Sequence, residues 1–409
     1  MCVSVLGGYP DLVGSQVEAD QRNQALMEAL QANRYALQIE DGEWSGPGAE
    51  WILERARRAG VVSVGESHGV REVSEFVSAL FQELRPEGFQ HLVIETSPWT
   101  AEQLTAFQRE GGDGYRAHLR EHPLSVPFYG WEEEWRLLAQ VVRGSEATEP
   151  LWGVDQLFAF APSWSLARLA ELAPTPEAEE RVASLQAEPE GEAPLSLPQL
   201  EEEALASVRE SFSSVPEARR ILDEMEVSRE IYLLFSQGEN WASNQMRARY
   251  LRRNVMGRFQ ETWRRDGTPP RLLVKLGAFH TYRARTPNNA LDVGNLAVAL
   301  AEAMGREALN VAVLCGPDSE GADFPAGTVD CWDRNAMIHD PFEELLREEA
   351  SPVLFDLRAL RSRLHQGDLE VEDRTLEGFL WSHDAVVFLP GANPSTPIVP
   401  PPEPPPPGP

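Results

Sequence analysis

Short apolar segments and longer amphipathic segments alternate along most of this chain. Six segments are short and rich in apolar and β-branched residues, which is typical of buried strands: 61–64, 91–95, 151–155, 271–277, 310–314 and 385–389. Four others have a helical pattern: 17–40, 49–59, 70–84 and 296–305. Because strands joined through helices pair in parallel, we expect an α/β fold with a mostly parallel central sheet flanked by helices.

The chain between the third and fourth of these strands has a different pattern. Residues 161–264 are mostly helical in pattern, and they predict a helical insertion or cap. The α/β core is then expected to comprise residues 1–160 and 265–390. Residues 391–409 are rich in proline, which predicts an extended, disordered tail that either binds a partner or is inert.

Composition narrows the classes of function. The formal net charge is −29, which repels a phosphate backbone, so we expect no nucleic-acid partner. No apolar run reaches the roughly 18 residues of a membrane helix, and the first residues lack the basic region of a signal peptide, so we expect a cytoplasmic protein. The three cysteines form no CxxC pair. Cys315 and Cys331 could form a bridge, but we expect them to be reduced.

Ionisable residues follow four of the predicted strands. They are Glu66 and His68 after the first strand, Glu95 at the end of the second, Asp155 at the end of the third, and His280, Tyr282 and Arg283 after the fourth. Ligands bind beyond the carboxyl ends of the strands in open parallel sheets, so this pattern predicts one shared polar site. The alternative is a helix-capping turn in which Glu66 and His68 bond only to backbone groups.

The turn from Gly65 to Gly69 is the centre of this expected site. Its glycines allow tight backbone geometry and close approach of a ligand. His68, next to carboxylates, could act as a general base. Arg71 lies on the first turn of the following helix. It could clamp a substrate anion, hold Glu95 in place, or form an ordinary surface salt bridge.

Three further residues are candidates for the site. The chain has one lysine, Lys275, against 35 arginines. Codon usage that favours arginine explains this count, and the functional alternative is a position that needs a compact ammonium group. His280 could be a second base, an electrophile or a metal ligand. Trp131 lies in the aromatic and acidic segment 128–135, which could line a pocket or form a helix start packed with core aromatics.

The segment 64–72 (Val-Gly-Glu-Ser-His-Gly-Val-Arg-Glu), the helix after it and the strand that ends at Glu95 resemble the erythromycin-esterase-like proteins. The wider superfamily includes the ChaN-like haem-binding proteins and the Tiki-like metal-dependent proteases. The single residue between Glu66 and His68 is the spacing of the ChaN-like branch, whereas the Arg-Glu continuation is that of the esterases. The segment 275–283 looks like the later histidine motif of this superfamily.

The resemblance implies a sheet-based α/β core with a helical insertion, and a site built on Glu66, His68, Glu95 and His280. It also implies that the motif histidine activates water without a serine nucleophile. No Gly-x-Ser-x-Gly elbow accompanies these residues.

A hydrolase of the esterase type, acting on a small-molecule or natural-product ester or amide, is therefore the first hypothesis. His68 would take a proton from water, and Glu66 or Glu95 would orient its ring. His280, Arg71 or Lys275 would stabilise the oxyanion. The expected substrate contacts are Asp155, Tyr282, Arg283 and Trp131.

Two other functions are open at this point. Glu66, His68, Glu95 and His280 include enough nitrogen and oxygen donors to bind a divalent metal in a metal-dependent hydrolase or oxidase. Alternatively, a ChaN-like protein would bind haem, with Tyr282 or His280 as axial ligand. No cofactor is certain from the sequence, and a divalent metal is favoured over haem.

Overall fold

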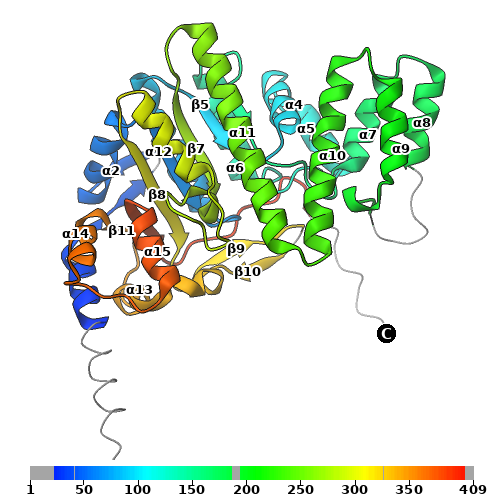
Figure 1. The fold of residues 1–409 in the computed structure, drawn as a ribbon. Coiled ribbons are helices and arrows are strands. Elements are labelled where there is room, and N and C mark those ends of the chain that lie inside the picture. Colours follow the sequence, from blue (N-terminus) through cyan, green and yellow to red (C-terminus); the bar gives the residue numbers. More distant parts are fainter. Residues whose placement is uncertain (1–22, 41, 187–193, 326, 401–409) are drawn as a thin grey trace, which may run out of the picture.

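The computed structural model describes residues 23–40, 42–186, 194–325 and 327–400, and its centre is one eight-stranded sheet (Figure 1). The strands lie in the order β1 (Arg34–Ala36), β11 (Val353–Asp356), β12 (Ala385–Leu389), β8 (Ala308–Cys315), β4 (Val61–Glu66), β7 (Arg271–Gly277), β5 (Phe89–Ile94) and β6 (Leu151–Gly153). Neighbouring strands from β12 to β6 pair in parallel, whereas β11 pairs antiparallel with both β12 and β1. The predicted mostly parallel α/β sheet is thus confirmed.

Helices cover both faces of the sheet, as a parallel sheet requires. Alternate residues of β4 show this, because Val62 and Val64 pack into one core while Val61 packs into another. The first core is covered by α2 (Pro47–Arg58), α3 (Arg71–Leu84) and α6 (Glu132–Gly144). The opposite face is covered by α12 (Val293–Ala303) and the long helix α11 (Asn240–Asp266).

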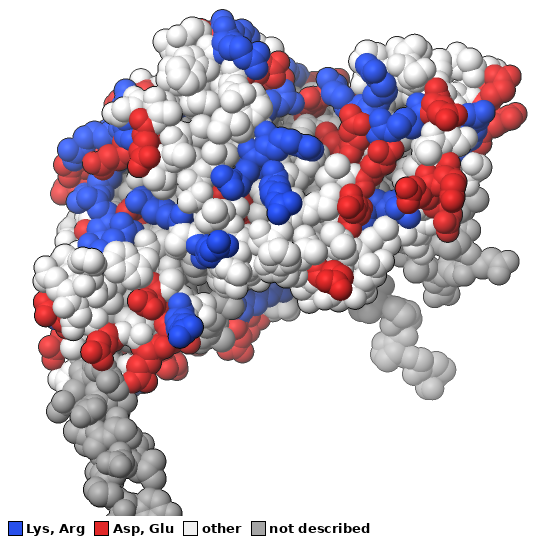
Figure 2. Space-filling view, in the orientation of Figure 1, with Lys and Arg blue, Asp and Glu red and all other residues white. Residues whose placement is uncertain are grey.

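Helices fill the chain between β6 and β7. They are α7 (Pro162–Glu171), α8 (Pro176–Gln186), α9 (Glu202–Ser211), α10 (Pro216–Ser236) and α11. The first three lie to one side of the sheet, whereas α11 runs across it (Figure 1). Despite the acidic net charge, α11 carries seven arginines, and basic side chains gather over it in the space-filling view (Figure 2).

The remaining elements are short. They are β2 (Gln38–Glu40), β3 (Glu43–Ser45), β9 (Glu320–Ala322), β10 (Thr328–Asp330), α4 (Pro98–Arg109), α5 (Asp113–Glu121), α13 (His339–Leu346), α14 (Arg358–Gln366), α15 (Arg374–Ser382), and the 3₁₀ turns η1 (Arg85–Glu87), η2 (Leu197–Gln199), η3 (Ala278–Thr281) and η4 (Asp333–Ile338). No helix in the described part of the chain is long and apolar enough to cross a membrane.

Three sequence predictions about local structure need correction. Residues 17–22 of the helix predicted over 17–40 lie outside the described part, residues 23–32 are helical, and the prediction is wrong beyond residue 32. Residues 34–36 instead form the edge strand β1, whose partner β11 lies more than 300 residues away. Cys315 and Cys331 were expected to be reduced, but they form a disulfide. The disorder predicted from residue 391 is wrong for 391–400, where Ile398 is buried in the core; residues 401–409 lie outside the described part.

Candidate active site

The carboxyl ends of four adjacent parallel strands form the edge at which the polar side chains meet. In the order β4, β7, β5 and β6, these ends bring Glu66, the Gly277–His280 turn, Glu95 and Asp155 to one place. Period-two alternation directs Lys275 to the face of β7 that α6 covers, which is also the face on which Glu66 lies. The sheet order therefore brings together residues that are up to about 200 positions apart in sequence.

His68 lies between two carboxylates. Its Nδ1 atom is 3.0 Å from Oε1 of Glu66, and its Nε2 atom is 3.6 Å from Oε2 of Glu95. Because an ionised carboxylate only accepts, Glu66 fixes the tautomer in which Nδ1 carries the proton and Nε2 is free to accept one. Gly69 makes this turn possible, since its φ is +78°. Glu66 thus contacts side chains, so the alternative of a capping turn bonded only to backbone is wrong.

Phe128 forms one wall of the site. Its ring stacks on the His68 imidazole, with 4.0 Å between ring centroids and 5° between planes. The His68 side chain remains 24% exposed, so its other side stays accessible. Phe128 therefore restricts the rotation of the imidazole without closing the site.

Glu66 is held by a buried ammonium group. Lys275 Nζ lies 2.6 Å from Oε2 of Glu66 and 2.7 Å from Oε1 of Glu134, and the lysine side chain is 0% exposed. Burial raises the pKa of Glu66, but the Lys275 charge and the His68 hydrogen bond outweigh it, so this pKa lies below its usual value. Lys275 therefore keeps Glu66 ionised and cannot itself reach a substrate.

Glu95 accepts from three directions. The backbone N–H of Gly277 donates to Oε2 at 2.6 Å, Arg247 donates to Oε1 at 2.9 Å, and His280 Nε2 lies 3.5 Å from Oε1. Burial raises the pKa of Glu95, but His280, His68 and Arg247 hold it well below the usual range. Glu95 is consequently an anion at neutral pH.

His280 is a cation rather than a base. Its Nδ1 atom lies 2.8 Å from Oδ2 of Asp292, and Glu95 faces its other nitrogen. Burial lowers the pKa of His280, but Asp292 and Glu95 outweigh it and raise the pKa to about 10. The sequence analysis left His280 open as a second base, an electrophile or a metal ligand. Its positive charge favours the role of electrophile over that of second base.

The gap between His68 and Glu95 is kept open by Gly277. A Cβ atom at this position would lie 2.7 Å from His68 Nε2 and 3.3 Å from Glu95 Oε2. Burial lowers the pKa of His68, but the Glu95 charge and the Glu66 hydrogen bond outweigh it and raise the pKa above 6.5. A basic nitrogen, a carboxylate and a small open space therefore lie together.

Arg247 on α11 is a site residue that the sequence analysis missed. It binds Asp155 through two nitrogens, with Nε 2.9 Å from Oδ1 and Nη2 2.5 Å from Oδ2, and it also binds Glu95. This fork-shaped pairing joins the helical stretch to the sheet edge. Asn244 and Ser243 on the same helix line the adjoining cavity, but nothing in the local pattern of α11 distinguishes Arg247 from its six other arginines.

Four of the expected site residues lie elsewhere. Arg71 pairs with Glu133 at 3.5 Å and does not contact Glu95. Tyr282 is 2% exposed and packs in a separate core, and Arg283 pairs with Asp384. Trp131 is the N-cap residue of α6 and lines an apolar cavity next to the site.

The donor set does not fit a metal or haem. Among the residues that the structure describes, no group of three or more His, Cys, Asp or Glu side chains is arranged to hold a metal ion. The oxygens of Glu66 and Glu95 already face cationic or N–H donors. Neither expected axial ligand is available for haem. Tyr282 is buried among Phe379 and His383, and both ring nitrogens of His280 face carboxylates, those of Asp292 and Glu95.

A cavity of about 430 Å³ opens beside His68 and Glu95. The sheet edge contributes Asp155 and Gln156, the segment 127–128 contributes Phe128, and α10 and α11 contribute Tyr232, Phe235 and Arg247. This volume lies within the range of small-molecule sites. The cavity brings polar groups and aromatic walls to one face of the His68 ring.

Three solved structures share this fold. A protein from Bacillus cereus has a TM-score of 0.58 at 16% identity, over 92% of this chain and 99% of its own. A succinoglycan biosynthesis protein has a TM-score of 0.59 at 13% sequence identity, over 92% of this chain and 99% of its own. A mutant of the erythromycin esterase EreC in its open conformation has a TM-score of 0.57 at 14% sequence identity, over 90% of this chain and 99% of its own. No protein-family model matches the sequence, and the search of curated proteins gave no match.

These similarities define the class of fold. The chain has the α/β architecture of the erythromycin esterase EreC along almost its whole length. The fold expected from the resemblance to erythromycin-esterase-like proteins is thereby confirmed. At these identities the similarity concerns the fold, so the chemistry rests on the site itself.

Proposed function

We propose that this protein is a hydrolase of the esterase type, which cleaves an ester or amide bond in a small molecule with water activated by His68. The observation that carries the proposal is the His68 ring, whose Nδ1 is held by Glu66 while Nε2 faces the gap kept open by Gly277. A nitrogen oriented in this way, beside a cavity of ligand size, is what general-base catalysis needs.

The reaction would proceed in two steps. His68 Nε2 accepts a proton from water as the water oxygen adds to the carbonyl carbon. The tetrahedral intermediate then expels the alcohol or amine, which receives the proton from His68. Phe128 and Glu66 keep the imidazole in one orientation throughout, and no serine nucleophile takes part.

Charge around the reacting carbonyl comes from the cations of the site. His280, with its pKa raised to about 10, and Arg247, which lines the cavity, both contact Oε1 of Glu95, and their charges would favour a developing oxyanion nearby. Lys275 acts differently from the sequence hypothesis, because it is fully buried and serves to hold Glu66. Arg71 has no oxyanion role in this mechanism, because it pairs with Glu133 rather than with the residues around His68.

Hydrolysis of 4-nitrophenyl acetate and 4-nitroacetanilide tests the proposal. We expect the His68→Asn variant to lose a factor of about 10²–10⁴ in turnover, the usual contribution of a general base. His365→Asn is the matched control, since His365 is exposed on α14. Equal turnover in the wild type and the His68→Asn variant would rule out the mechanism.

A further inference from the structure

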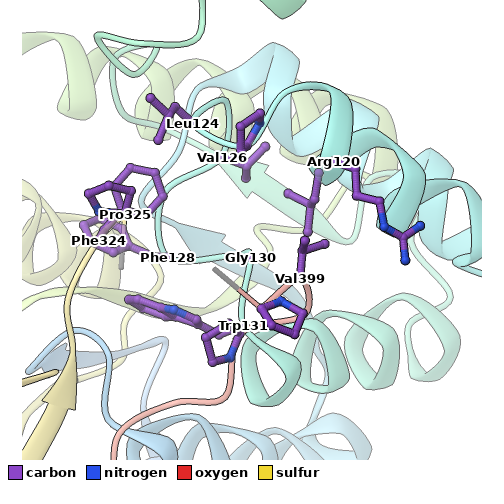
Figure 3. Close-up of a pocket in the computed structure, with 13 residues that line it drawn as sticks. Arg120, Leu124, Val126, Phe128, Gly130, Trp131, Phe324, Pro325 and Val399 are labelled. Atoms are coloured by element: carbon purple, nitrogen blue, oxygen red, sulfur yellow. The ribbon is translucent and has the colours of Figure 1, made fainter. Parts of the chain in front are cut away.

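A second cavity lies directly behind the wall of the site, and it is apolar. Its volume is about 430 Å³, and its lining includes Leu124, Val126, Phe324 and Val399. Figure 3 shows these side chains around a common space, with the Arg120 guanidinium pointing away from it. An apolar cavity of this size next to a polar site is a typical place for the apolar part of a ligand.

The two cavities share a wall. Phe128 lines both, with one face on the His68 imidazole. Phe158 lines the polar cavity and Phe324 the apolar one, and their rings meet edge to face with centroids 5.3 Å apart. The rings of Phe128, Phe158 and Phe324 therefore form an aromatic partition between the two cavities.

The backbone at Phe128, which is part of this partition, is strained. The N–H of Tyr129 donates to the carbonyl oxygen of Pro127 at 2.8 Å, and Phe128 between them has φ +68°. A γ-turn with positive φ is rare and strained, above all for a bulky residue. Tyr129 ties this turn to the site, because its hydroxyl accepts from the backbone N–H of Glu95 at 3.1 Å. Strain of this kind persists where the surrounding structure fixes it, and it is common at ligand sites.

We propose that the apolar cavity behind Phe128 is a substrate subsite, which takes an uncharged aliphatic or aromatic group of the ester or amide that reacts at His68. This inference rests on the proposed function and adds the class of substrate. The bound substrate would extend past the Phe128 side chain into both cavities. The carbonyl of the substrate would lie in the polar cavity, and its apolar group would lie between Leu124, Phe324 and Val399. The absence of an inward charge among the described lining residues excludes an ionic group there.

Binding of the uncharged fluorophore N-phenyl-1-naphthylamine tests the subsite without any need for turnover. We expect saturable binding to the full chain, weakened at least tenfold by Val399→Trp, which fills the cavity. Pro400→Trp adds bulk at the exposed rim of the same cavity and is expected to act in the same direction. Met304→Trp is the matched control, because Met304 lines a different cavity that shares no lining residue with this one, and the variant should bind like the wild type.

The second readout is the NMR signal of the His68 ring, assigned by its loss in His68→Asn. Because Phe128 contacts both the cavity and this imidazole, saturation with the probe should shift the signal in the wild type and not in Val399→Trp. Unchanged binding in both cavity variants, loss of binding in Met304→Trp, or binding without a shift of the His68 signal would overturn the subsite. Failure of ester hydrolysis alone would instead count against the proposed function.

Discussion

Lys275 and Glu66 lie on neighbouring parallel strands and form a fully buried ion pair, with 2.6 Å between Nζ and Oε2. The other oxygen of Glu66 holds Nδ1 of His68. The single lysine of the chain thus acts on the proposed base through one intermediate carboxylate. It is a positioning residue, and its effect on stability can be separated from its effect on turnover.

Replacing Lys275 with methionine should lower the free energy of unfolding by roughly 3–5 kcal/mol, because it leaves the buried carboxylates of Glu66 and Glu134 without their cation. Urea denaturation monitored by circular dichroism measures this loss. Adding Glu134→Gln to the variant removes one of the unpaired charges and should restore part of the stability. A loss below about 1 kcal/mol would show that the ion pair is not what holds this region together.

Gly277→Ala should reduce turnover of 4-nitrophenyl acetate by about 100-fold while the protein stays folded. The added methyl group would occupy the space 2.7 Å from His68 Nε2, and displacement of a catalytic group by about 1 Å has an effect of this size. Gly378→Ala is the matched control, because a Cβ atom there meets no atom within 4 Å. Full activity in Gly277→Ala would mean that the gap between His68 and Glu95 plays no part in the reaction.

His280 should make stability depend on pH in the alkaline range. Its folded pKa of about 10 exceeds the usual value near 6.5, so its contribution is fully present below pH 6.5 and is lost as pH rises to 10. The charges that face it are Asp292, Glu95 and the opposing Arg247. The contribution is at most about 5 kcal/mol. Urea unfolding at pH 6, 8 and 10 should show a smaller alkaline loss in His280→Gln; parallel losses would contradict this assignment.

Arg247→Met should loosen the junction between α11 and the sheet edge. The variant leaves Asp155 and Glu95 without the guanidinium that joins them, so amide hydrogen exchange should accelerate near the start of α11 and after β6. Arg249→Met is the matched control on the exposed side of the same helix. Equal exchange in the two variants would mean that the Arg247 pairing does not hold α11 in place.

The sequence predicts the part of the site that depends on local pattern. Four parallel strands, β4, β5, β6 and β7, each end at or are followed by a polar residue, so Glu66, Glu95, Asp155 and His280 follow from the rule that strand ends share an edge. This prediction of the site residues does not require knowledge of the order of the strands in the sheet. The glycine-bounded turn likewise marks His68 without any knowledge of its partners.

The rest of the site depends on tertiary packing, which no local pattern records. Arg247 matters because α11 crosses the strand ends, and its sequence resembles any basic helix. Phe128 has a positive φ that is not favoured by its residue type. The segment 391–400 has the composition of a tail, yet Trp131 and Val70 bridge to it and Ile398 is buried there. Tyr282 follows the right strand, but it turns into a different core.

The pH dependence of kcat/KM for 4-nitrophenyl acetate, compared with the NMR titration of His68, tests the central claim most directly. A general base acts in its neutral form, and Glu95 and Glu66 raise the pKa of His68. The account predicts that kcat/KM rises with pH through a midpoint above 6.5, that the His68 signal titrates at the same midpoint, and that Glu66→Gln lowers both. A flat profile, or a midpoint that does not follow the titration of His68, would contradict it.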